Sequence, residues 1–297
     1  MKLTWLPDAA RRPRRIAIGT FDGVHRGHRD VIAGADTVLT FDPHPSLVVH
    51  PESAPQLLTD LDRKAELVAE LGVEELIVIP FDGAFSKQTA QEFIDHVLIE
   101  QLGATHVNVG DNFHFGAKAQ GNAEMLAADG RFEVRIAPLT EVAGAPVSST
   151  RIRQLLRDEG DVEQAAELLG SQYKLTGTVV HGDKRGRELG FPTANIVPDD
   201  RFVTPAHGIY ACRTGQGRAA AVNIGVRPTF QTGRGVLIEA YVLDFTADLY
   251  GQQISLTFVE RLRGELKFDG IDPLIEQMNK DVERTRQVVS VGEATGA

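Results

Sequence analysis

The sequence has almost no cysteine and no long hydrophobic run. Cys212 is the single cysteine among 297 residues, which excludes an internal disulfide and is typical of a reducing compartment. No uninterrupted run of about 18 apolar residues occurs, so no membrane span is expected. The basic N-terminal residues are not followed by the apolar segment of a secretory signal. These absences together predict a cytoplasmic globular protein.

The sequence also lacks the positive charge of a nucleic-acid-binding protein. Its formal net charge is −10, whereas such proteins gain affinity by neutralising phosphates. Basic residues cluster locally instead, at 11–15, 151–157 and 184–187, which suits small phosphorylated ligands, although ordinary solvated charge is the commoner origin of such clusters. No G-x-x-x-x-G-K-[ST] motif is present, and this excludes a P-loop kinase.

The first half of the chain alternates strand and helix patterns. Apolar runs at 16–20, 37–41, 76–80, 105–110 and 132–137 are typical of buried parallel strands. Between them, Leu61, Ala65, Val68 and Leu71 form the stripe of a core-facing helix, and segments 89–100 and 149–158 behave similarly. This alternation predicts an α/β fold with a parallel, Rossmann-like sheet.

Beyond about residue 172 the pattern becomes β-rich. Runs at 173–181, 209–213, 218–225, 236–244 and 253–262 are separated by turn residues, and one amphipathic helix follows them. We expect a small antiparallel β-barrel with a C-terminal helix. The helix predicted at 161–169 ends at Gly170, so we place one domain at 1–171 and a second at 172–297.

The first candidate site is GTFDGVHRGH at residues 19–28. An apolar strand enters a glycine-rich turn, and two histidines three residues apart stand where a helix should begin, an arrangement that can bind phosphates. A chance His-x-x-His on a surface helix is the alternative. The segment resembles the HxGH nucleotidyltransferase superfamily, in which these histidines contact ATP phosphates. The resemblance implies an ATP-binding set comprising Gly19, Phe21, Asp22, Gly23, His25, Gly27 and His28.

A second element is VSSTRIR at 147–153, which opens a predicted helix. Ser148 or Ser149 can cap that helix, and the arginines can bind phosphate oxygens. An ordinary capped amphipathic helix would look the same. Beside the first motif it resembles the second phosphate-binding motif of the superfamily, which implies that Ser148, Ser149, Thr150, Arg151 and Arg153 contact ATP.

Two further stretches, TFDPHP at 40–45 and VGDNFHFGAKAQGN at 109–122, are similar to the FMN-adenylyltransferase module of bacterial bifunctional FAD synthetases. The resemblance implies that Asn112, Phe113, Phe115 and Gly116 help to form the flavin and nucleotide pockets. Aromatic rings offer stacking surfaces for isoalloxazine or adenine. Without the resemblance, the two phenylalanines would be interpreted as core residues at the end of a strand.

The second candidate site is HGDKRGRELGFPTAN at 181–195. Its glycines allow a loop to fold around phosphates, and its basic residues supply positive charge. The hydroxyl of Thr193 and the carboxamide of Asn195 are hard oxygen donors of the kind that Mg²⁺ accepts. A flexible turn is the alternative. The segment resembles the riboflavin kinase motif, which implies an ATP-binding set of Gly182, Lys184, Gly186, Arg187, Gly190, Pro192, Thr193 and Asn195, with Thr193 and Asn195 at the metal.

Glu239 interrupts the apolar strand VLIEAYVLD, where phosphoryl transfer would need a carboxylate to orient the attacking hydroxyl. An outward-facing glutamate on a half-exposed strand is the alternative. Glu239 matches the catalytic glutamate of riboflavin kinases, and the strings VNIGVRPTF, DLYG and FVERLRGELKF around it match as well. The resemblance implies a riboflavin pocket with Asn223, Arg227, Thr229, Arg263 and Phe268.

These motifs predict a bifunctional transferase of the riboflavin kinase/FMN adenylyltransferase family. It would use ATP and Mg²⁺ to convert riboflavin to FMN and FMN to FAD. Two alternatives are a riboflavin kinase whose first domain is weak or differently specific, and a non-catalytic flavin or nucleotide sensor. One departure stands out: related synthetases usually have a longer helical crossover between the two N-terminal motifs than Arg29 to Thr37 provides.

Overall fold

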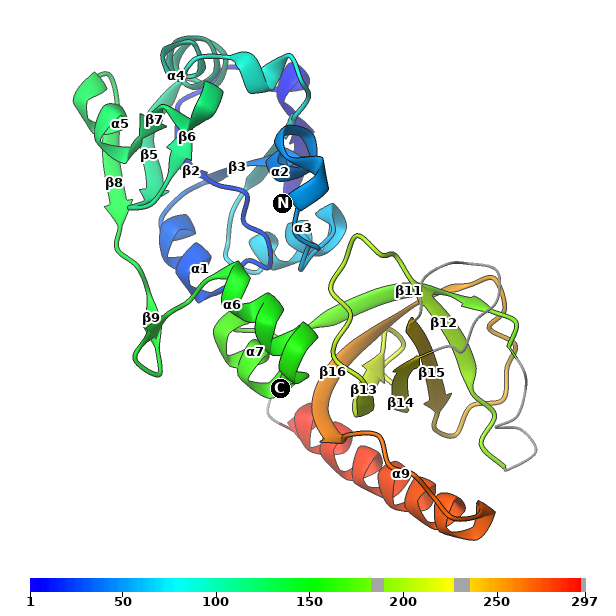
Figure 1. Cartoon of the computed structure of the whole chain (residues 1–297). Coiled ribbons are helices and arrows are strands. Elements are labelled where there is room, and N and C mark those ends of the chain that lie inside the picture. The colour runs from blue at the N-terminus through cyan, green and yellow to red at the C-terminus, as the bar shows by residue number, and fades with distance from the viewer. Residues whose placement is uncertain (183–189, 227–235, 295–297) are drawn as a thin grey trace. The chain divides into compact units, whose positions relative to one another are not determined.

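The computed structural model describes residues 1–182, 190–226 and 236–294 (Figure 1). The chain divides into two compact units, residues 1–149 and 150–297. The helices α6 (Ser149–Gln154), η6 (Leu155–Glu159) and α7 (Val162–Leu169) thus fall almost entirely in the second unit. A functional boundary after residue 171 stays a prediction.

The first unit is built on a six-stranded sheet in the order β1-β4-β3-β2-β5-β8, with every neighbouring pair parallel. The strands are β1 (Lys2–Trp5), β2 (Arg14–Ile18), β3 (Thr37–Asp42), β4 (Glu75–Pro80), β5 (Ala104–Gly110) and β8 (Glu133–Ala137). The predicted parallel α/β fold is therefore confirmed. The edge strand β1 was not predicted, because in its four residues only Thr4 is buried.

Helices cover both faces of this sheet. They are α1 (Arg26–Ile32), α2 (Pro45–Val49), α3 (Leu61–Ala69), α4 (Ala90–Glu92), the π-helical η4 (Phe93–Leu102) and α5 (Ala123–Asp129). Ile16 and Ile18 pack in one core cluster with residues of η4, whereas Ala17 packs in another with residues of α1 and α3. Alternate side chains of one strand thus reach opposite layers.

A buried ion pair links the first residues of β2 and β4, and a hydrogen bond from β1 joins it. Arg14, which is 2% exposed, donates to Glu75 Oε2 at 3.1 Å and to the Leu102 carbonyl at 2.7 Å. Thr4 Oγ1 donates to Glu75 Oε1 at 2.9 Å. Burial alone would raise the pKa of Glu75, but the hydrogen bonds from Thr4, Arg14 and Arg12 outweigh it and lower that pKa. The ionised carboxylate therefore belongs to the folded state of this unit.

The second unit contains a closed antiparallel barrel in the order β11-β12-β15-β14-β13-β16. Its strands are β11 (Lys174–Val180), β12 (Ala194–Pro198), β13 (Gly208–Thr214), β14 (Ala219–Val226), β15 (Val236–Val242) and β16 (Gln253–Arg263). The helix α9 (Ile271–Ala294) packs against β13, β14 and β16. The predicted barrel with a terminal helix is confirmed. Among the described residues no helix is long and apolar enough to cross a membrane.

Candidate functional sites

The GTFDGVHRGH segment lies where the sheet of the first unit changes direction. From β2 the chain crosses through α1 to β3 on one side, while β5 pairs with β2 on the other. Ligands of open parallel sheets bind outside the carboxyl ends of strands at such a point. The loop 19–25 follows β2, and the predicted flavin segment 109–122 starts in the last residues of β5 and continues beyond it, so both candidate motifs flank this position.

His25 and His28 lie together at the start of α1. His25 is the N-cap of the helix, and its Nδ1 accepts a hydrogen bond from the His28 amide at 3.3 Å. The two imidazole rings stack with centroids 3.5 Å apart, and Phe21 packs edge-on against His28 at 5.3 Å. The capping bond explains why the first histidine is buried, at 5% exposure, while the second is only half-buried. The sequence motif thus produces one paired-imidazole cluster.

Asp22 has a structural environment that the sequence did not reveal. It is 2% exposed, and its carboxylate accepts hydrogen bonds from the Leu58 amide at 2.9 Å and the Thr59 amide at 3.1 Å. Thr59 Oγ1 in turn accepts from the Gly23 amide at 3.1 Å. Asp22 therefore ties the loop to the segment before α3, since both of its oxygens meet backbone donors there.

Of the second predicted phosphate motif, Ser148 and Ser149 belong to the first unit. The Ser149 hydroxyl donates to the Asp22 carbonyl at 2.9 Å, which brings this motif to the loop after β2. Thr150, Arg151 and Arg153 follow in α6, within the second unit. Their contact with ATP stays a prediction.

The segment after β5 separates the predicted flavin-pocket residues. Phe115 is 7% exposed and packs in the core against Phe93, with centroids 5.5 Å apart. Phe113 is partly exposed and stacks on Phe115 at 5.5 Å, and Asn112 is exposed. At Gly116, φ is +73° and a Cβ would meet the Ala90 backbone nitrogen at 2.5 Å, so only glycine fits there. Phe113 and Asn112 are thus better placed for a ligand than Phe115.

The shortened crossover between β2 and β3 contains the helix α1, which has only seven residues. Two side chains of the sheet bind carbonyls near its C-terminal end. The amide of Asn108, on β5, donates to the Val31 and Ala33 carbonyls at 3.2 Å each, and Arg135, on β8, donates to the Asp30 carbonyl at 2.8 Å. These side chains satisfy carbonyls that a longer helix would bond internally.

Three of the residues predicted for the kinase site form a polar row across the barrel. Asn195 on β12 lies opposite Glu239 on β15, which lies opposite Asn223 on β14. Directly opposed residues of antiparallel strands point to the same face, and here the alternate residues, such as Ile196 and Ile238, fill the interior. Asn223 Nδ2 donates to Glu239 Oε2 at 3.4 Å. The carboxylate therefore stands on the outer face of the barrel between two carboxamides.

Gly182 is packed directly against Asn195. A Cβ added at Gly182 would lie 2.1 Å from Asn195 Nδ2, so a larger residue would displace the side chain that the sequence assigns to the metal. Thr193 is half-buried just before β12, while Pro192 and Gly190 are exposed. Five other predicted residues lie outside the described residues: Lys184, Gly186, Arg187, Arg227 and Thr229.

Arg263 and Phe268 lie at the end of the same row. Arg263 on β16 is opposite Ile209 on β13, which is opposite Asn223. The Arg263 guanidinium donates to Asp281 of α9 at 2.7 Å and stands 6.0 Å from the Phe268 ring centroid. The terminal helix therefore fixes this arginine, and its place in a riboflavin pocket stays a prediction.

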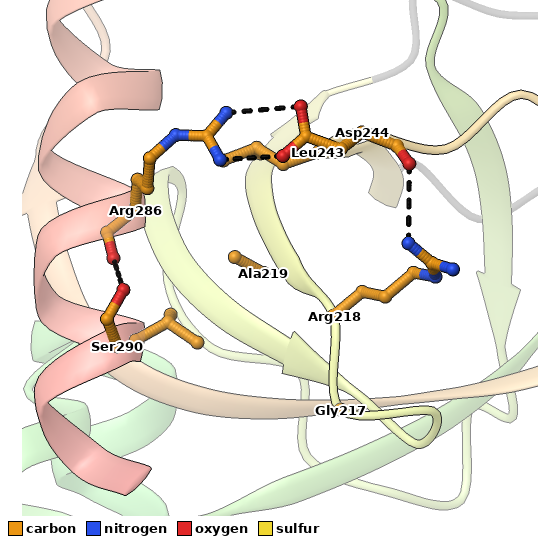
Figure 2. A pocket seen from close by; sticks show the side chains of 8 residues that line it. Gly217, Arg218, Ala219, Leu243, Asp244, Arg286 and Ser290 are labelled. Atoms are coloured by element: carbon orange, nitrogen blue, oxygen red, sulfur yellow. Dashed lines mark hydrogen bonds and ion pairs between the residues drawn. The ribbon is translucent and has the colours of Figure 1, made fainter. Parts of the chain in front are cut away.

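A cavity of about 190 Å³ lies at the other end of the strands, between the β13–β14 turn, the residues after β15 and α9 (Figure 2). Arg286 pairs with the Asp244 carboxylate at 2.6 Å, and Arg218 donates to the Asp244 carbonyl at 3.3 Å. Asp244 is thus bound by arginines of the β13–β14 turn and of α9, all of which line the cavity. Because none of the predicted site residues lines it, the cavity is separate from the polar row.

Comparison with known proteins covers both units. A family model described as FAD synthetase matches residues 8–151, and one described as riboflavin kinase matches residues 169–289. The chain is 41% identical over 287 residues to the bifunctional riboflavin kinase/FMN adenylyltransferase of Listeria monocytogenes, covering 91% of each chain. The protein of that name from Escherichia coli K12 is 37% identical over 283 residues, with 90% of each chain covered.

A solved structure is similar over the same span. A protein titled macrolide-efflux protein from Streptococcus pneumoniae has a TM-score of 0.85 and 32% identity, covering 96% of this chain and 99% of that one. The efflux activity in that title concerns the other protein, while both matched family models describe flavin chemistry. The sequence, the two sites and the comparisons agree: the chain belongs to the bifunctional riboflavin kinase/FMN adenylyltransferase family, whose members phosphorylate riboflavin to FMN and adenylylate FMN to FAD.

Proposed function

We propose that the two reactions occupy the two sites described above, with riboflavin phosphorylation on the barrel and FMN adenylylation at the loop after β2. ATP is the co-substrate of both reactions in this family. The observation that carries the assignment is the polar row Asn195–Glu239–Asn223, which places one carboxylate between two amides on neighbouring strands. Among the described residues of the barrel, the sequence predicted for the kinase motif occurs at no second place.

In the kinase reaction Glu239 would accept the proton of the riboflavin hydroxyl as its oxygen attacks the γ-phosphorus of ATP. The oxygen–phosphorus bond to the new ester forms while the bond to ADP breaks. Phosphoryl transfer needs mainly positioning and charge stabilisation, and a carboxylate can orient the attacking hydroxyl. The 3.4 Å hydrogen bond from Asn223 supports this role, because it fixes one oxygen of Glu239.

The oxygen donors of Thr193 and Asn195 fit a magnesium ion brought in with ATP. Mg²⁺ keeps several waters and takes few protein oxygens beside phosphates, so a hydroxyl and a carboxamide suffice. The tight packing of Gly182 against Asn195 supports the assignment, because it holds the carboxamide beside the loop predicted to bind phosphates. When bound, the ion would neutralise charge on the transferring phosphate.

In the adenylyltransferase reaction a phosphate oxygen of FMN attacks the α-phosphorus of ATP, and pyrophosphate leaves. This nucleophile is largely ionised near pH 7, so no general base is needed. His25, His28, Ser148 and the backbone of the loop 19–24 would donate hydrogen bonds to the phosphates, and Phe113 would offer its ring to the flavin. The stacked imidazole pair, at 3.5 Å between centroids, supports this role because it concentrates two donors at one point.

The remaining expectations concern the setting of the enzyme. We infer a cytoplasmic location from the single cysteine, and no nucleic-acid partner from the net charge of −10. Riboflavin, FMN, FAD and ATP are then its partners.

The magnesium assignment is tested with Asn195→Ala. We expect the Mg²⁺ concentration for half-maximal FMN formation to rise about tenfold, as is common when a supporting ligand is lost. FAD formation from supplied FMN by the same variant is the control and should keep its Mg²⁺ dependence. An unchanged Mg²⁺ requirement in FMN formation would remove Asn195 from the metal site.

A further inference from the structure

The segment 58–64, here called the brace, contacts the loop 19–24 at three points that the family motifs do not include. The Leu58 and Thr59 amides bind the Asp22 carboxylate, and Thr59 Oγ1 accepts from the Gly23 amide at 3.1 Å. The third contact comes from Lys64, one turn into α3. The loop is therefore held from one side by a single short stretch of chain.

Lys64 is the unusual member of the brace, because it is a lysine with only 7% of its surface exposed. Its ammonium donates to the Thr20 carbonyl at 2.7 Å and to Thr40 Oγ1 at 3.3 Å. Thr40 Oγ1 also donates to the Thr20 carbonyl, at 3.1 Å. One carbonyl of the loop thus receives two hydrogen bonds, one of them charge-assisted.

The electrostatic setting of Lys64 combines burial with two nearby carboxylates. Burial lowers the pKa of the Lys64 ammonium, while the carboxylates of Asp22 and Asp42 act in the opposite direction. A buried ammonium is costly unless it is paired and hydrogen-bonded. The two acceptors and the two nearby carboxylates offset part of that cost where β2 and β3 end.

The loop needs such support because its backbone is strained. Phe21 has φ of +48° and Val24 has φ of +44°, values that side-chain-bearing residues rarely adopt. Such a conformation is unfavourable and persists only where surrounding contacts hold it in place. These two residues flank Asp22 and Gly23, the two loop residues bound to Leu58 and Thr59.

We propose that Lys64 is a positioning residue for adenylyl transfer, which acts through the Thr20 carbonyl to hold the loop 19–24 in the form that binds ATP phosphates, with Thr59 doing the same through Gly23. The proposal rests on the phosphate-binding role proposed above for this loop. Lys64 itself is buried behind the loop and contacts no substrate.

The test compares Lys64→Met with Lys87→Met, the same change at an exposed lysine of the first unit. Methionine keeps an unbranched side chain, one atom shorter than that of lysine, and removes the amino group and its hydrogen-bond donors. We expect kcat/KM for ATP in FAD formation to fall about tenfold to a hundredfold, since a small misplacement of a binding group has effects of that size. The KM for FMN and the rate of FMN formation should stay within about twofold, as for Lys87→Met.

Folding of the first unit is followed separately through Trp5, the single tryptophan of the chain, which lies in β1. The assays are made at temperatures where its fluorescence reports a folded unit. If Lys64→Met does not fold, Thr59→Val and Thr59→Ser decide. Serine keeps the hydroxyl that accepts from the Gly23 amide, so Thr59→Ser should retain the kcat/KM for ATP that Thr59→Val loses. If Thr59 acted through packing alone, valine, which has the shape of threonine, would be the better tolerated of the two.

The outcomes separate this proposal from the one it rests on. If His28→Ala leaves FAD formation unchanged, the role of the loop itself is wrong. If His28→Ala impairs FAD formation but Lys64→Met, or Thr59→Val when the first does not fold, leaves kcat/KM for ATP unchanged, the positioning role is overturned. Equal losses for ATP and FMN would also overturn it, because they would indicate general damage to the unit.

Discussion

The two units carry the side chains that we propose to be functional on different kinds of structure. In the barrel, Asn195, Glu239 and Asn223 sit on adjacent strands, so the backbone ladder fixes their spacing. In the first unit, His25 follows a loop in which Phe21, Gly23 and Val24 have positive φ. This loop depends on side-chain contacts to hold its shape. A site on strands needs little local support, whereas a site on a strained loop needs a brace.

The largest effect that separates the two units is expected from Glu239→Gln. FMN formation should fall about a thousandfold, since a general base contributes about 10²–10⁴ to the rate. FAD formation from supplied FMN should be unchanged, because Glu239 belongs to the second unit. Both rates are measured by chromatography of the flavin products. Loss of both activities in a folded variant would contradict the assignment of one reaction to each unit.

The reciprocal change is His28→Ala. FAD formation should fall about 10²–10³-fold, the usual cost of removing one donor to a developing negative charge. FMN formation from riboflavin should persist. The control is His96→Ala, because His96 lies in the same unit but on the surface, where it pairs with Glu100. A similar loss of FAD formation in both histidine variants would show that the effect is not specific to the stacked pair.

Glu75→Gln should lower the stability of the first unit and leave that of the second unchanged. The change leaves Arg14 buried without its charge partner, which typically costs about 3 kcal/mol or more. Trp5 fluorescence should show earlier unfolding of the first unit in urea, while the melting of the barrel, followed by FMN formation, should stay as in the unchanged protein. Equal destabilisation of the two units would show that they do not unfold independently.

The same carboxylate predicts the pH dependence of the first unit. The pKa of Glu75 is lowered on folding, so its stabilising contribution is present above the unfolded value of 4.5 and is lost as the pH falls through the folded pKa. In Glu75→Gln this contribution is absent, so the difference in stability between variant and unchanged protein should narrow as the pH falls below about 4.5. A difference that is constant with pH would contradict the role of the ionised carboxylate.

A smaller effect is expected where the shortened crossover is supported. Asn108→Ala removes the donors to the Val31 and Ala33 carbonyls, and unsatisfied buried acceptors cost about 1–3 kcal/mol. FAD formation should be reduced more at 37 °C than at 20 °C, while FMN formation should not respond. Asn108→Asp keeps the shape but turns a buried carboxylate toward the same two carbonyls, so its loss should be at least as large as that of alanine.

The sequence predicted most of the fold because periodicity is a local signal. Five of the six parallel strands and the barrel with its helix follow from apolar patterns, whereas β1 is too short and too exposed to show one. The motif residues were found for a similar reason, since they are contiguous. The row of Asn195, Glu239 and Asn223 joins three distant segments, and only the pairing of strands brings them together.

The sequence shows that Lys64 of the brace is unusual, but it does not show which groups Lys64 contacts. Lys64 follows Leu61 by three residues on the predicted apolar stripe of α3, and a lysine on a core-facing stripe indicates a buried partner. Likewise Asn108 interrupts the apolar run of β5. Their partners are backbone carbonyls of Thr20, Val31 and Ala33, which every residue possesses, so no sequence pattern identifies them.

A mixture of two variants is the sharpest test that each unit carries out one of the two reactions. Glu239→Gln and His28→Ala are each incubated with riboflavin, ATP and Mg²⁺, alone and together, and the flavins are separated by chromatography. We expect no appreciable FAD from either variant alone and FAD from the mixture, because FMN made by one chain is adenylylated by the other. FAD from Glu239→Gln alone, or none from the mixture, would contradict it.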